Sequence, residues 1–315
     1  MVIDFEHHFS MSGHHRPNVE RYWEGDELRF FPSSVGSGIE SHVEFIDAAG
    51  IDIAVLTGQH FNPELDNLKK WHDVCARAVS DYPSRFIGFA GCKPMGGDAF
   101  FDELDRAVGE LGMKGVQISA RPAGEYLDSK KLWPFWEKVS ELDIPVDVHI
   151  SSRFGWDDLK SNYGLHYVLA REFDMGANVF RVCQGGVLEA FPGLKLIMNH
   201  FGGSAMAVKE RMDLYENLCG DDFWQGEKLI TRPYNEYFDK LYFNMAGRGR
   251  AINTVKSTLA HVSPKRMVFG SDWPPNYEHE PEECQAYIDD IKGLDMPAED
   301  IEAILSGNGK ELLGL

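Results

Sequence analysis

The sequence has few of the features that mark secreted, membrane or disulfide-stabilised proteins. Its five cysteines are widely spaced and form no CxxC pair, which argues against a disulfide framework or a cysteine zinc site and for a reducing compartment. No apolar run approaches the ~18 residues that a membrane-spanning helix requires. The N-terminus, MVIDFEHHF, lacks the basic start and apolar stretch of a signal peptide. We therefore expect a cytoplasmic protein.

Positive charge is also scarce. The chain has 31 Lys and Arg against 50 Asp and Glu, which gives a net charge of −19. A field of this sign repels nucleic acid and anionic membrane surfaces, so we expect neither as a partner. It would also repel an anionic substrate at long range. An acidic substrate would therefore need a local metal ion or an arginine to hold it.

Short apolar runs rich in β-branched residues alternate with helix-like stretches along the 315 residues. Two of these stretches, Ala99–Leu111 and Lys131–Leu142, have apolar residues at about 3.6-residue spacing, as an amphipathic helix does. The eight runs are Val2–Phe9, Ile51–Thr57, Arg85–Cys92, Met113–Ser119, Ile144–Ile150, Leu194–His200, Lys240–Ala246 and Arg266–Asp272. Eight alternating strand and helix units predict an α/β fold that closes into a (β/α)8 TIM barrel, and the chain length is usual for one.

A doubly wound open sheet is the rival architecture. It usually has a glycine-rich phosphate turn after its first strand, whereas this chain has EHHFSMSG there and no GxGxxG. The longest irregular stretch, Ser10–Ile39, is rich in Gly, Pro, Ser and aromatic residues. We expect it to be an elaborated loop after the first strand, over the barrel mouth. Nothing indicates a domain boundary, so we expect one domain over residues 1–315.

Four of the predicted strands end in residues that bind metals or move protons. Barrel active sites lie at the C-terminal strand ends, where the chain has Glu6-His7-His8, His149, Asn199-His200 and Ser271-Asp272. Strict alternation along the first strand puts Glu6 and His8 on one face together with Asp4, and His7 on the other face together with Phe5. A lone histidine at a strand end is more often structural, but four such ends at one rim are hard to attribute to chance.

The candidate ligands are Glu6, His8, His149 and Asp272. Two imidazoles and two carboxylates suit Zn²⁺ or Mn²⁺. Such an ion can lower the pKa of bound water to about 7, or chelate the oxygens of a substrate. Lys114 opens the fourth strand, at the end remote from this rim, so we expect one divalent ion without a bridging carboxylated lysine.

Five motifs occur in order along nearly the whole chain. They are DYPSRFIGF at 81–89, LGMKGVQI at 111–118, YLDSKKLWPFW at 126–136 with IPVDVH at 144–149, FPGLKLIMNHFGG at 191–203, and FGSDWP at 269–274. Together they resemble the amidohydrolase superfamily, in the amidohydrolase-2 branch that contains aminocarboxymuconate-semialdehyde decarboxylase and γ-resorcylate decarboxylase. The resemblance implies that His149 and Asp272 are metal ligands and that His200 is a catalytic histidine facing the metal. Relatives of this kind suggest a homodimer or homotetramer.

Two departures from the pattern of this family concern the site. Most members carry His-x-His on the first strand, whereas this chain has Glu6-x-His8, as the γ-resorcylate type does. That type also tends to have a glutamate three residues after the sixth-strand histidine, where this chain has Gly203. The resemblance is therefore to the branch and not to one enzyme.

The preferred hypothesis is a metal-dependent non-oxidative decarboxylase (a carboxy-lyase) acting on a hydroxyaryl or enol-type carboxylic acid. The metal would hold the carboxylate and a neighbouring hydroxyl, and Asp272 or His200 would protonate the carbon that loses CO2. The alternative is a metal-dependent hydrolase of a lactone, amide or C–C bond, in which metal-bound hydroxide attacks, Asp272 takes its proton and His200 polarises the carbonyl. A hydratase follows the same logic. A barrel that only binds ligands is the third hypothesis, since a barrel alone does not fix function.

Four residues after the predicted strands could contact a planar acid. Arg153 and Arg248 would bind its charge, and Phe201 and Trp273 would cover its ring. The structural alternative is that these arginines are solvated and that the aromatic rings pack on one another. Release of CO2 from hydroxybenzoates would favour the decarboxylase, and products from esters or lactones without CO2 would favour the hydrolase.

Overall fold

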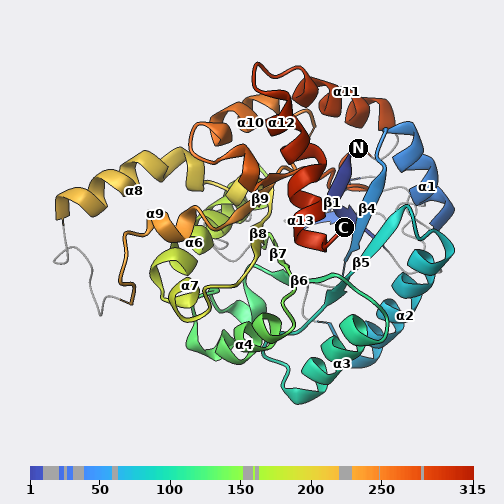
Figure 1. Cartoon of the computed structure of the whole chain (residues 1–315), viewed down its shortest axis with the longest axis horizontal. Coiled ribbons are helices and arrows are strands. Elements are labelled where there is room, and N and C mark those ends of the chain that lie inside the picture. The colour runs from blue at the N-terminus through green and yellow to red at the C-terminus, as the bar shows by residue number, and fades with distance from the viewer. Residues whose placement is uncertain are drawn as a thin grey trace.

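The eight predicted strands form one parallel sheet. The computed structural model describes residues 1–9, 21–24, 27–30, 39–58, 63–151, 159, 163–219, 229–247, 249–277 and 280–315. In it the strands pair in the order β1-β4-β5-β6-β7-β8-β9-β10 (Figure 1). Their bounds are β1 Ile3–His8, β4 Ile53–Thr57, β5 Phe86–Gly91, β6 Gly115–Ser119, β7 Val146–His149, β8 Leu196–Met198, β9 Tyr242–Asn244 and β10 Met267–Val268. Each strand lies within a predicted run, so the strand prediction is confirmed.

Backbone hydrogen bonds between the first and last strands close the sheet into the predicted barrel. The amide of Phe5 donates to the carbonyl of Phe269 at 2.9 Å. Beyond the end of β10, the amide of Asp272 donates to the carbonyl of Glu6 at 2.9 Å, and the amide of His8 donates to the carbonyl of Trp273 at 2.8 Å. The prediction that Asp272 ends a strand is therefore corrected. Asp272 lies four residues past Val268, held along the end of β1 by this seam.

Helices cover the outside of the barrel (Figure 1). The α-helices are α1 Ile39–Ala48, α2 Leu65–Asp81, α3 Asp98–Gly109, α4 Trp133–Glu141, α6 Arg171–Gln184, α7 Val187–Ala190, α8 Ala205–Cys219, α9 Asn235–Phe238, α10 Ile252–Leu259, α11 Pro281–Lys292, α12 Ala298–Glu302 and α13 Asn308–Leu313. Short 3-10 or π-helical turns are η1 Pro122–Gly124, η2 Lys130–Leu132, η3 His166–Ala170, η4 His200–Gly202, η6 Pro264–Arg266 and η7 Ala303–Gly307. α3 and α4 match the two predicted helices to within two residues at each end.

Among the described residues the core consists of two clusters, one on each face of the sheet. The larger cluster lies between the strands and the surrounding helices, where α3 contributes Phe100, Leu104 and Ala107 from one buried face. The smaller cluster fills the N-terminal half of the barrel interior and includes Ile3, Phe5, Val55, Phe89, Ile197, Tyr242 and Val268. α13 closes this end of the barrel, where Leu312 and Leu313 join the inner cluster. The apolar floor leaves the opposite, C-terminal end of the interior for polar side chains.

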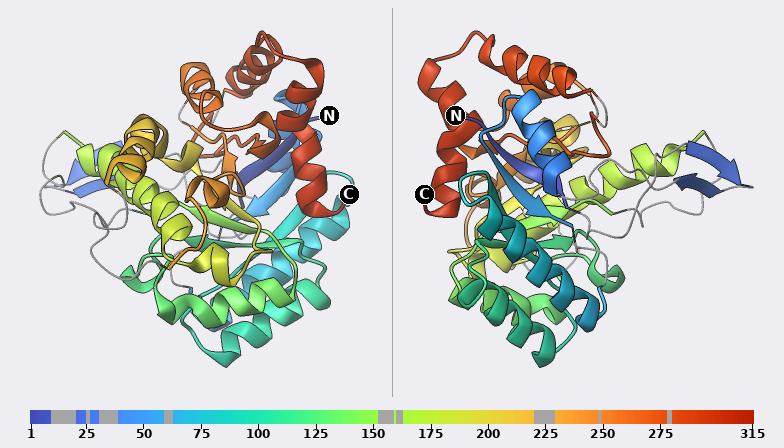
Figure 2. Two further views of the ribbon diagram at one scale, coloured as in Figure 1. Left: turned by 60° about the vertical axis from the view of Figure 1, so that its left-hand side comes forward. Right: turned by 90° about the vertical axis from the view of Figure 1, so that its right-hand side faces the viewer.

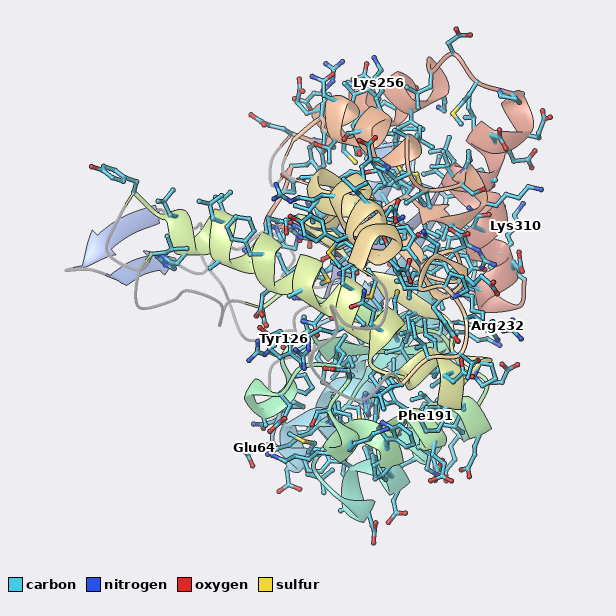
Figure 3. The ribbon with its side chains drawn as sticks, turned by 90° about the vertical axis from the view of Figure 1, so that its left-hand side faces the viewer. Glu64, Tyr126, Phe191, Arg232, Lys256 and Lys310 are labelled. Carbon is cyan, nitrogen blue, oxygen red and sulfur yellow. The ribbon has the colours of Figure 1, made fainter. Side chains whose placement is uncertain are left out.

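The stretch predicted to be an irregular first loop contains regular structure, so this prediction was incomplete. β2 (Arg21–Glu24) and β3 (Glu27–Phe30) pair antiparallel. They lie away from the barrel body, next to the projecting N-terminal end of the long helical segment that contains α6 (Figures 2 and 3). Within the described residues, no helix is both long and apolar enough to cross a membrane.

Candidate metal centre

A bulge in β1 turns Glu6 into the barrel. The register pairs Asp4 with Ala54 and His7 with Leu56, so β1 has one residue more than β4 over this stretch. The extra residue breaks the alternation of side chains. Phe5 therefore packs in the inner cluster on the same side as Glu6, and Asp4 bonds to His7 outside the barrel. The predicted grouping of Asp4 with Glu6 was wrong for this reason.

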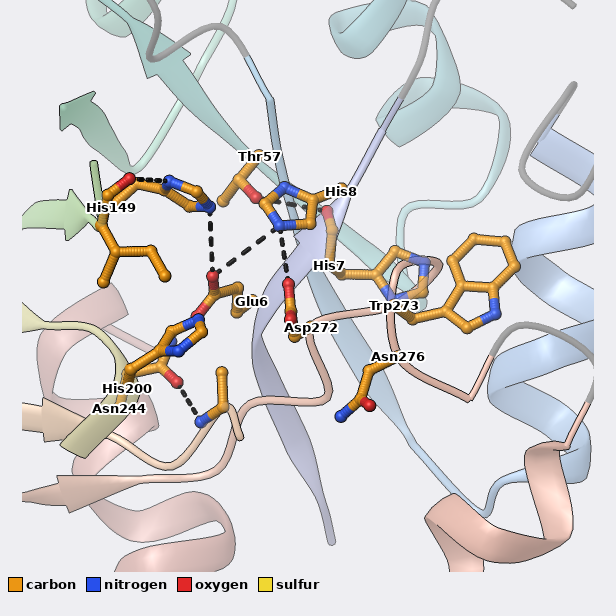
Figure 4. A network of polar contacts seen from close by, with 12 residues as sticks. Glu6, His7, His8, Thr57, His149, His200, Asn244, Asp272, Trp273 and Asn276 are labelled. Atoms are coloured by element: carbon orange, nitrogen blue, oxygen red, sulfur yellow. Dashed lines mark hydrogen bonds and ion pairs between the residues drawn. The ribbon is translucent and has the colours of Figure 1, made fainter. Parts of the chain in front are cut away.

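The structure brings the four predicted ligands together at the C-terminal strand ends. Figure 4 shows Glu6, His8, His149 and Asp272 turned toward one another. Nε2 of His8 lies 3.0 Å from Oδ1 of Asp272 and 3.7 Å from Oε1 of Glu6. Nε2 of His149 lies 3.5 Å from the same oxygen of Glu6.

These positions fit a shared cation. Two ligand atoms that each lie about 2.1 Å from one ion can be at most about 4.2 Å apart, and the three separations above meet that limit. Both carboxylate oxygens of Glu6 are buried and have no hydrogen-bond partner among the described residues. A buried carboxylate without hydrogen bonds is costly unless a positive charge compensates for it. The mixed nitrogen and oxygen donors suit Mn²⁺ or Zn²⁺.

Contacts behind the ligands set their orientation. The Nδ1 of His149 lies 2.9 Å from the carbonyl oxygen of Ile150, which can only accept, so Nδ1 carries the proton and Nε2 presents its lone pair to the cluster. Asp4 holds the backbone on both sides of the seam, since its Oδ1 accepts from the amides of Glu6 at 3.2 Å and Ser271 at 2.8 Å. These bonds fix the chain at the ligand Glu6 and directly before Asp272.

The pKa values of the two carboxylate ligands, Glu6 and Asp272, shift in opposite directions. Burial, and then the negative charges of Asp272, Asp147 and Asp4, raise the pKa of Glu6 well above its ordinary value. Burial also acts to raise the pKa of Asp272, but the hydrogen bond of His8, the charges that His8 and His200 carry when protonated, and the charge of Arg171 outweigh it and lower that pKa. A cation bound among these groups would relieve the repulsion that Glu6 experiences.

Polar side chains line one part of the barrel interior close to Glu6. Asp147, two residues before His149 on β7, accepts a 2.7 Å hydrogen bond from Gln117 on β6. Burial raises the pKa of Asp147 to about 7, against the opposing effect of the hydrogen bond from Gln117. This layer separates the ligand cluster from the apolar floor.

His200 lies beside the predicted ligands. Glu6, His200 and Asp272 each offer a ligand-type atom within 4.8 Å of the others. The backbone there is unusual for residues with side chains, since φ is 50° at His200, 57° at Phe201 and 56° at Asp272. Such left-handed conformations are uncommon outside glycine and cluster at functional sites.

The structure places two other predicted site residues away from the cluster. Trp273 is 1% exposed, stacks on His7 and Phe45, and lies beyond His7 from the ligands (Figure 4). Trp273 therefore packs between the barrel and α1, and its predicted contact with a substrate stays a prediction. Phe201 is 3% exposed and belongs to the outer core. Arg153 and Arg248 lie outside the described residues.

Two residues near the site were missed because they belong to a helix and not to a strand end. Arg171 begins α6 and acts on Asp272 through its charge. Glu172, the next residue, lies 3.3 Å from Nδ1 of His200. The sequence gives no local signal for either contact, since α6 precedes His200 by many residues and nothing in its pattern indicates how it approaches the barrel mouth.

Comparison with known proteins supports the sequence resemblance. A family model described as amidohydrolase matches residues 3–315. The chain is 26% identical over 257 residues to a γ-resorcylate decarboxylase of Polaromonas sp. strain JS666, covering 77% of this chain and 75% of the relative. It is 26% identical over 272 residues to a 2-amino-3-carboxymuconate-6-semialdehyde decarboxylase of Dictyostelium discoideum, covering 84% and 71%. A 2-keto-4-carboxy-3-hexenedioate hydratase of Sphingobium sp. is 27% identical over 263 residues, covering 77% and 71%.

Solved structures share the fold. A 2,6-dihydroxybenzoate decarboxylase in complex with 2,6-dihydroxybenzoate superposes with a TM-score of 0.81 at 20% identity, covering 100% of this chain and 99% of the other. A dihydroxybenzoic acid decarboxylase of Polaromonas sp. JS666, with bound manganese and the inhibitor 2-nitroresorcinol, superposes with a TM-score of 0.79 at 22% identity, covering 100% and 97%.

Proposed function

We propose that this chain, which belongs to the amidohydrolase family, is a metal-dependent non-oxidative decarboxylase of a hydroxyaryl or enol-type carboxylic acid. The observation that carries the proposal is the convergence of Glu6, His8, His149 and Asp272 beside His200 at the C-terminal strand ends. The choice of decarboxylation is supported by the similarity to γ-resorcylate and aminocarboxymuconate-semialdehyde decarboxylases.

The four ligands would hold one divalent cation, Mn²⁺ or Zn²⁺. Manganese is favoured because a structurally similar decarboxylase binds it. When bound, the cation supplies a positive charge that holds the substrate carboxylate and a neighbouring hydroxyl and stabilises the negative charge that develops on them. The remaining chemistry falls to the side chains around it.

His200 and Asp272 are the groups placed to move a proton. The bond between the ring carbon and the carboxylate breaks, CO2 leaves, and the electron pair stays on the ring carbon. That carbon then takes a proton that Nε2 of His200, or the carboxylate of Asp272, has first accepted from the substrate hydroxyl or from solvent. General acid catalysis of this kind contributes about 10²–10⁴-fold to a rate. Arg171, with Arg153 and Arg248, would help hold the anionic substrate, and Phe201 would support the wall beside His200.

The test is CO2 release from a panel of hydroxybenzoates by the Mn²⁺-loaded protein, with 2,6-dihydroxybenzoate as the first substrate. We expect one CO2 per substrate consumed and the decarboxylated phenol as product. The matched control is the same preparation after removal of the metal by a chelator, which should release none. Turnover of lactones or esters, with no CO2 from any acid, would contradict the proposal.

Water addition or hydrolysis is the second candidate. It is favoured by the similarity to 2-keto-4-carboxy-3-hexenedioate hydratase. In that case Asp272 would accept a proton from the attacking water, and His200 would polarise the substrate carbonyl. Incorporation of solvent ¹⁸O into the product distinguishes this reaction from decarboxylation.

The cytoplasmic location and the homodimer or homotetramer stay predictions. Light scattering coupled to size-exclusion chromatography measures the oligomeric state directly. A monomer at micromolar concentration would contradict that prediction.

A further inference from the structure

One residue of α6 makes two separate contacts with the turn that carries His200. The carbonyl of Glu172 accepts a 2.9 Å hydrogen bond from the amide of Ser204, just past η4. Its carboxylate Oε1 lies 3.3 Å from Nδ1 of His200. We propose that Glu172 is the positioning residue of His200, which fixes the tautomer and the orientation of the imidazole so that Nε2 faces the metal ligands.

The tautomer follows from what each group can donate. A carboxylate only accepts hydrogen bonds, so the hydrogen between Glu172 and His200 belongs to Nδ1. Nε2 then carries the lone pair. This nitrogen is buried and has no hydrogen-bond partner among the described residues. One ring nitrogen of His200 lies within 4.8 Å of carboxylate oxygens of Glu6 and Asp272. Since Nδ1 is turned to α6, the geometry assigns this contact to Nε2.

α6 occupies the space that a side chain at position 203 would need. A Cβ atom at position 203 would lie 2.3 Å from the carbonyl oxygen of Glu172 and 2.8 Å from the Cβ of Met175. φ at Gly203 is +62°, a conformation that also disfavours a side chain. The carboxylate partner of His200 therefore comes from the helix, and position 203 must stay glycine to let the helix approach.

The backbone of the turn makes such an anchor necessary. Four consecutive residues from His200 to Gly203 have positive φ, and two of them carry side chains. A conformation of this kind persists only where the surroundings hold it. The bond from Ser204 to Glu172 fixes the end of the turn, and the carboxylate fixes the ring at its start.

Contacts with the chain after β6 fix the position of α6, so that Glu172 can in turn fix the position of His200. Asp174 is fully buried and pairs with Arg121 at 3.0 Å. Tyr126, close to α6 in Figure 3, contacts two guanidinium groups, with Arg121 at 3.6 Å and Arg181 of α6 at 4.3 Å from its ring centroid. Glu172 thus projects from a helix that the β6 end secures at two points.

The direct test measures the tautomer. Nitrogen-15 correlation spectra of the histidine rings in the Zn²⁺-loaded protein, with His200→Asn used to assign the signal, should show His200 with its proton on Nδ1. In Glu172→Ala we expect the Nε2–H form or a mixture of both. In Glu172→Gln the amide oxygen can still accept, so the Nδ1–H form should persist. Retention of a pure Nδ1–H form in Glu172→Ala would overturn the proposal.

The kinetic test rests on the proposed function. In Glu172→Ala we expect kcat to fall about 10–100-fold, the usual loss when a group that orients a functional residue is removed, with KM and the Mn²⁺ Kd within about twofold of the wild type. Glu172→Gln should recover part of kcat. Glu210→Ala, which removes an exposed carboxylate on α8, is the matched control and should leave kcat unchanged. An unchanged kcat in Glu172→Ala would also overturn the proposal.

The two tests separate the two claims. If the wild type releases no CO2 from any acid, the proposed function fails, and the tautomer of His200 still decides the role of Glu172. Thermal unfolding of each variant shows whether a change in the spectrum reflects a local effect, because Glu172 is one-third exposed and its removal should leave the melting curve in place.

Discussion

Two histidine–glutamate pairs in this barrel have the same chemistry and opposite settings. His72 on α2 donates from Nδ1 to Glu103 on α3 at 2.6 Å, and its Nε2 accepts a 3.0 Å hydrogen bond from the amide of Gly91. His200 also faces a glutamate with Nδ1, but its buried Nε2 has no hydrogen-bond partner among the described residues, and its ring lies beside the ligand atoms of Glu6 and Asp272. A histidine whose two ring nitrogens both have hydrogen-bond partners connects elements of the fold. A ring nitrogen without such a partner can instead transfer a proton or bind a ligand.

The largest expected effect is a loss of activity when His200 is replaced, with no such loss when His72 is replaced. His200→Asn should lower kcat by about 10²–10⁴-fold, because it removes the nitrogen that faces the substrate side of the site. The Mn²⁺ content should stay at one ion per chain. His72→Gln should leave kcat per folded molecule unchanged. Steady-state kinetics of both variants check this, and a loss of kcat in His72→Gln as large as that in His200→Asn would remove the distinction.

The ligand cluster should show the next effect, as a gain in stability on binding metal. Mn²⁺ at about 100 times its Kd should stabilise the wild type by about 2.7 kcal/mol. Glu6→Gln keeps the shape of the side chain and removes its charge, so it should abolish most of this gain. Urea unfolding with and without Mn²⁺ measures both. An equal gain in Glu6→Gln would mean that the ion binds elsewhere.

The buried pair should respond to pH through stability. Burial, helped by the charge of Arg106 and opposed by Glu103, lowers the pKa of His72 below its ordinary value of 6.5. The folded state therefore binds fewer protons than the unfolded state just below that pH, and the stability present above pH 6.5 is lost as pH falls through the folded pKa. His72→Gln should cost about 1–3 kcal/mol at neutral pH and weaken this dependence. Unfolding midpoints measured from pH 7.5 to 5 test it, and an unchanged slope would contradict it.

The smallest expected effect concerns Trp273, which lies at the seam between β1 and the chain that follows β10. Trp273→Phe should cost about 0.5–3 kcal/mol of stability, because Trp273 packs on His7 and Phe45 outside the barrel. KM for any substrate should change less than about twofold. A large rise in KM with no loss of stability would instead support the substrate contact that the sequence predicted for Trp273.

The fold was predictable because each strand is a separate apolar run. The strand ends also predicted that His8, His149 and His200 lie at one rim, since position along a strand decides which rim a side chain reaches. The inward orientation of Glu6 was predicted from an argument that was incomplete. The pattern assumed strict alternation, and only the bulge between Asp4 and His7 puts Phe5 and Glu6 on the same side.

Other parts of the site depend on tertiary contacts that no local pattern records. Trp273 follows the seam, and its orientation outward is set by the space between His7 and Phe45. Glu172 reaches His200 only because α6 crosses beside η4, where Gly203 leaves room for it. The glycine was visible as a departure from the family pattern, and its meaning required the helix that packs against it.

The central claim is that one divalent cation sits among Glu6, His8, His149 and Asp272. Anomalous diffraction from crystals grown with Mn²⁺ tests it most directly. We predict a single peak per chain within about 2.0–2.3 Å of one atom from each of the four side chains, with Nε2 of His200 facing it. A peak at another site, or a second ion bridged to the first, would contradict the account.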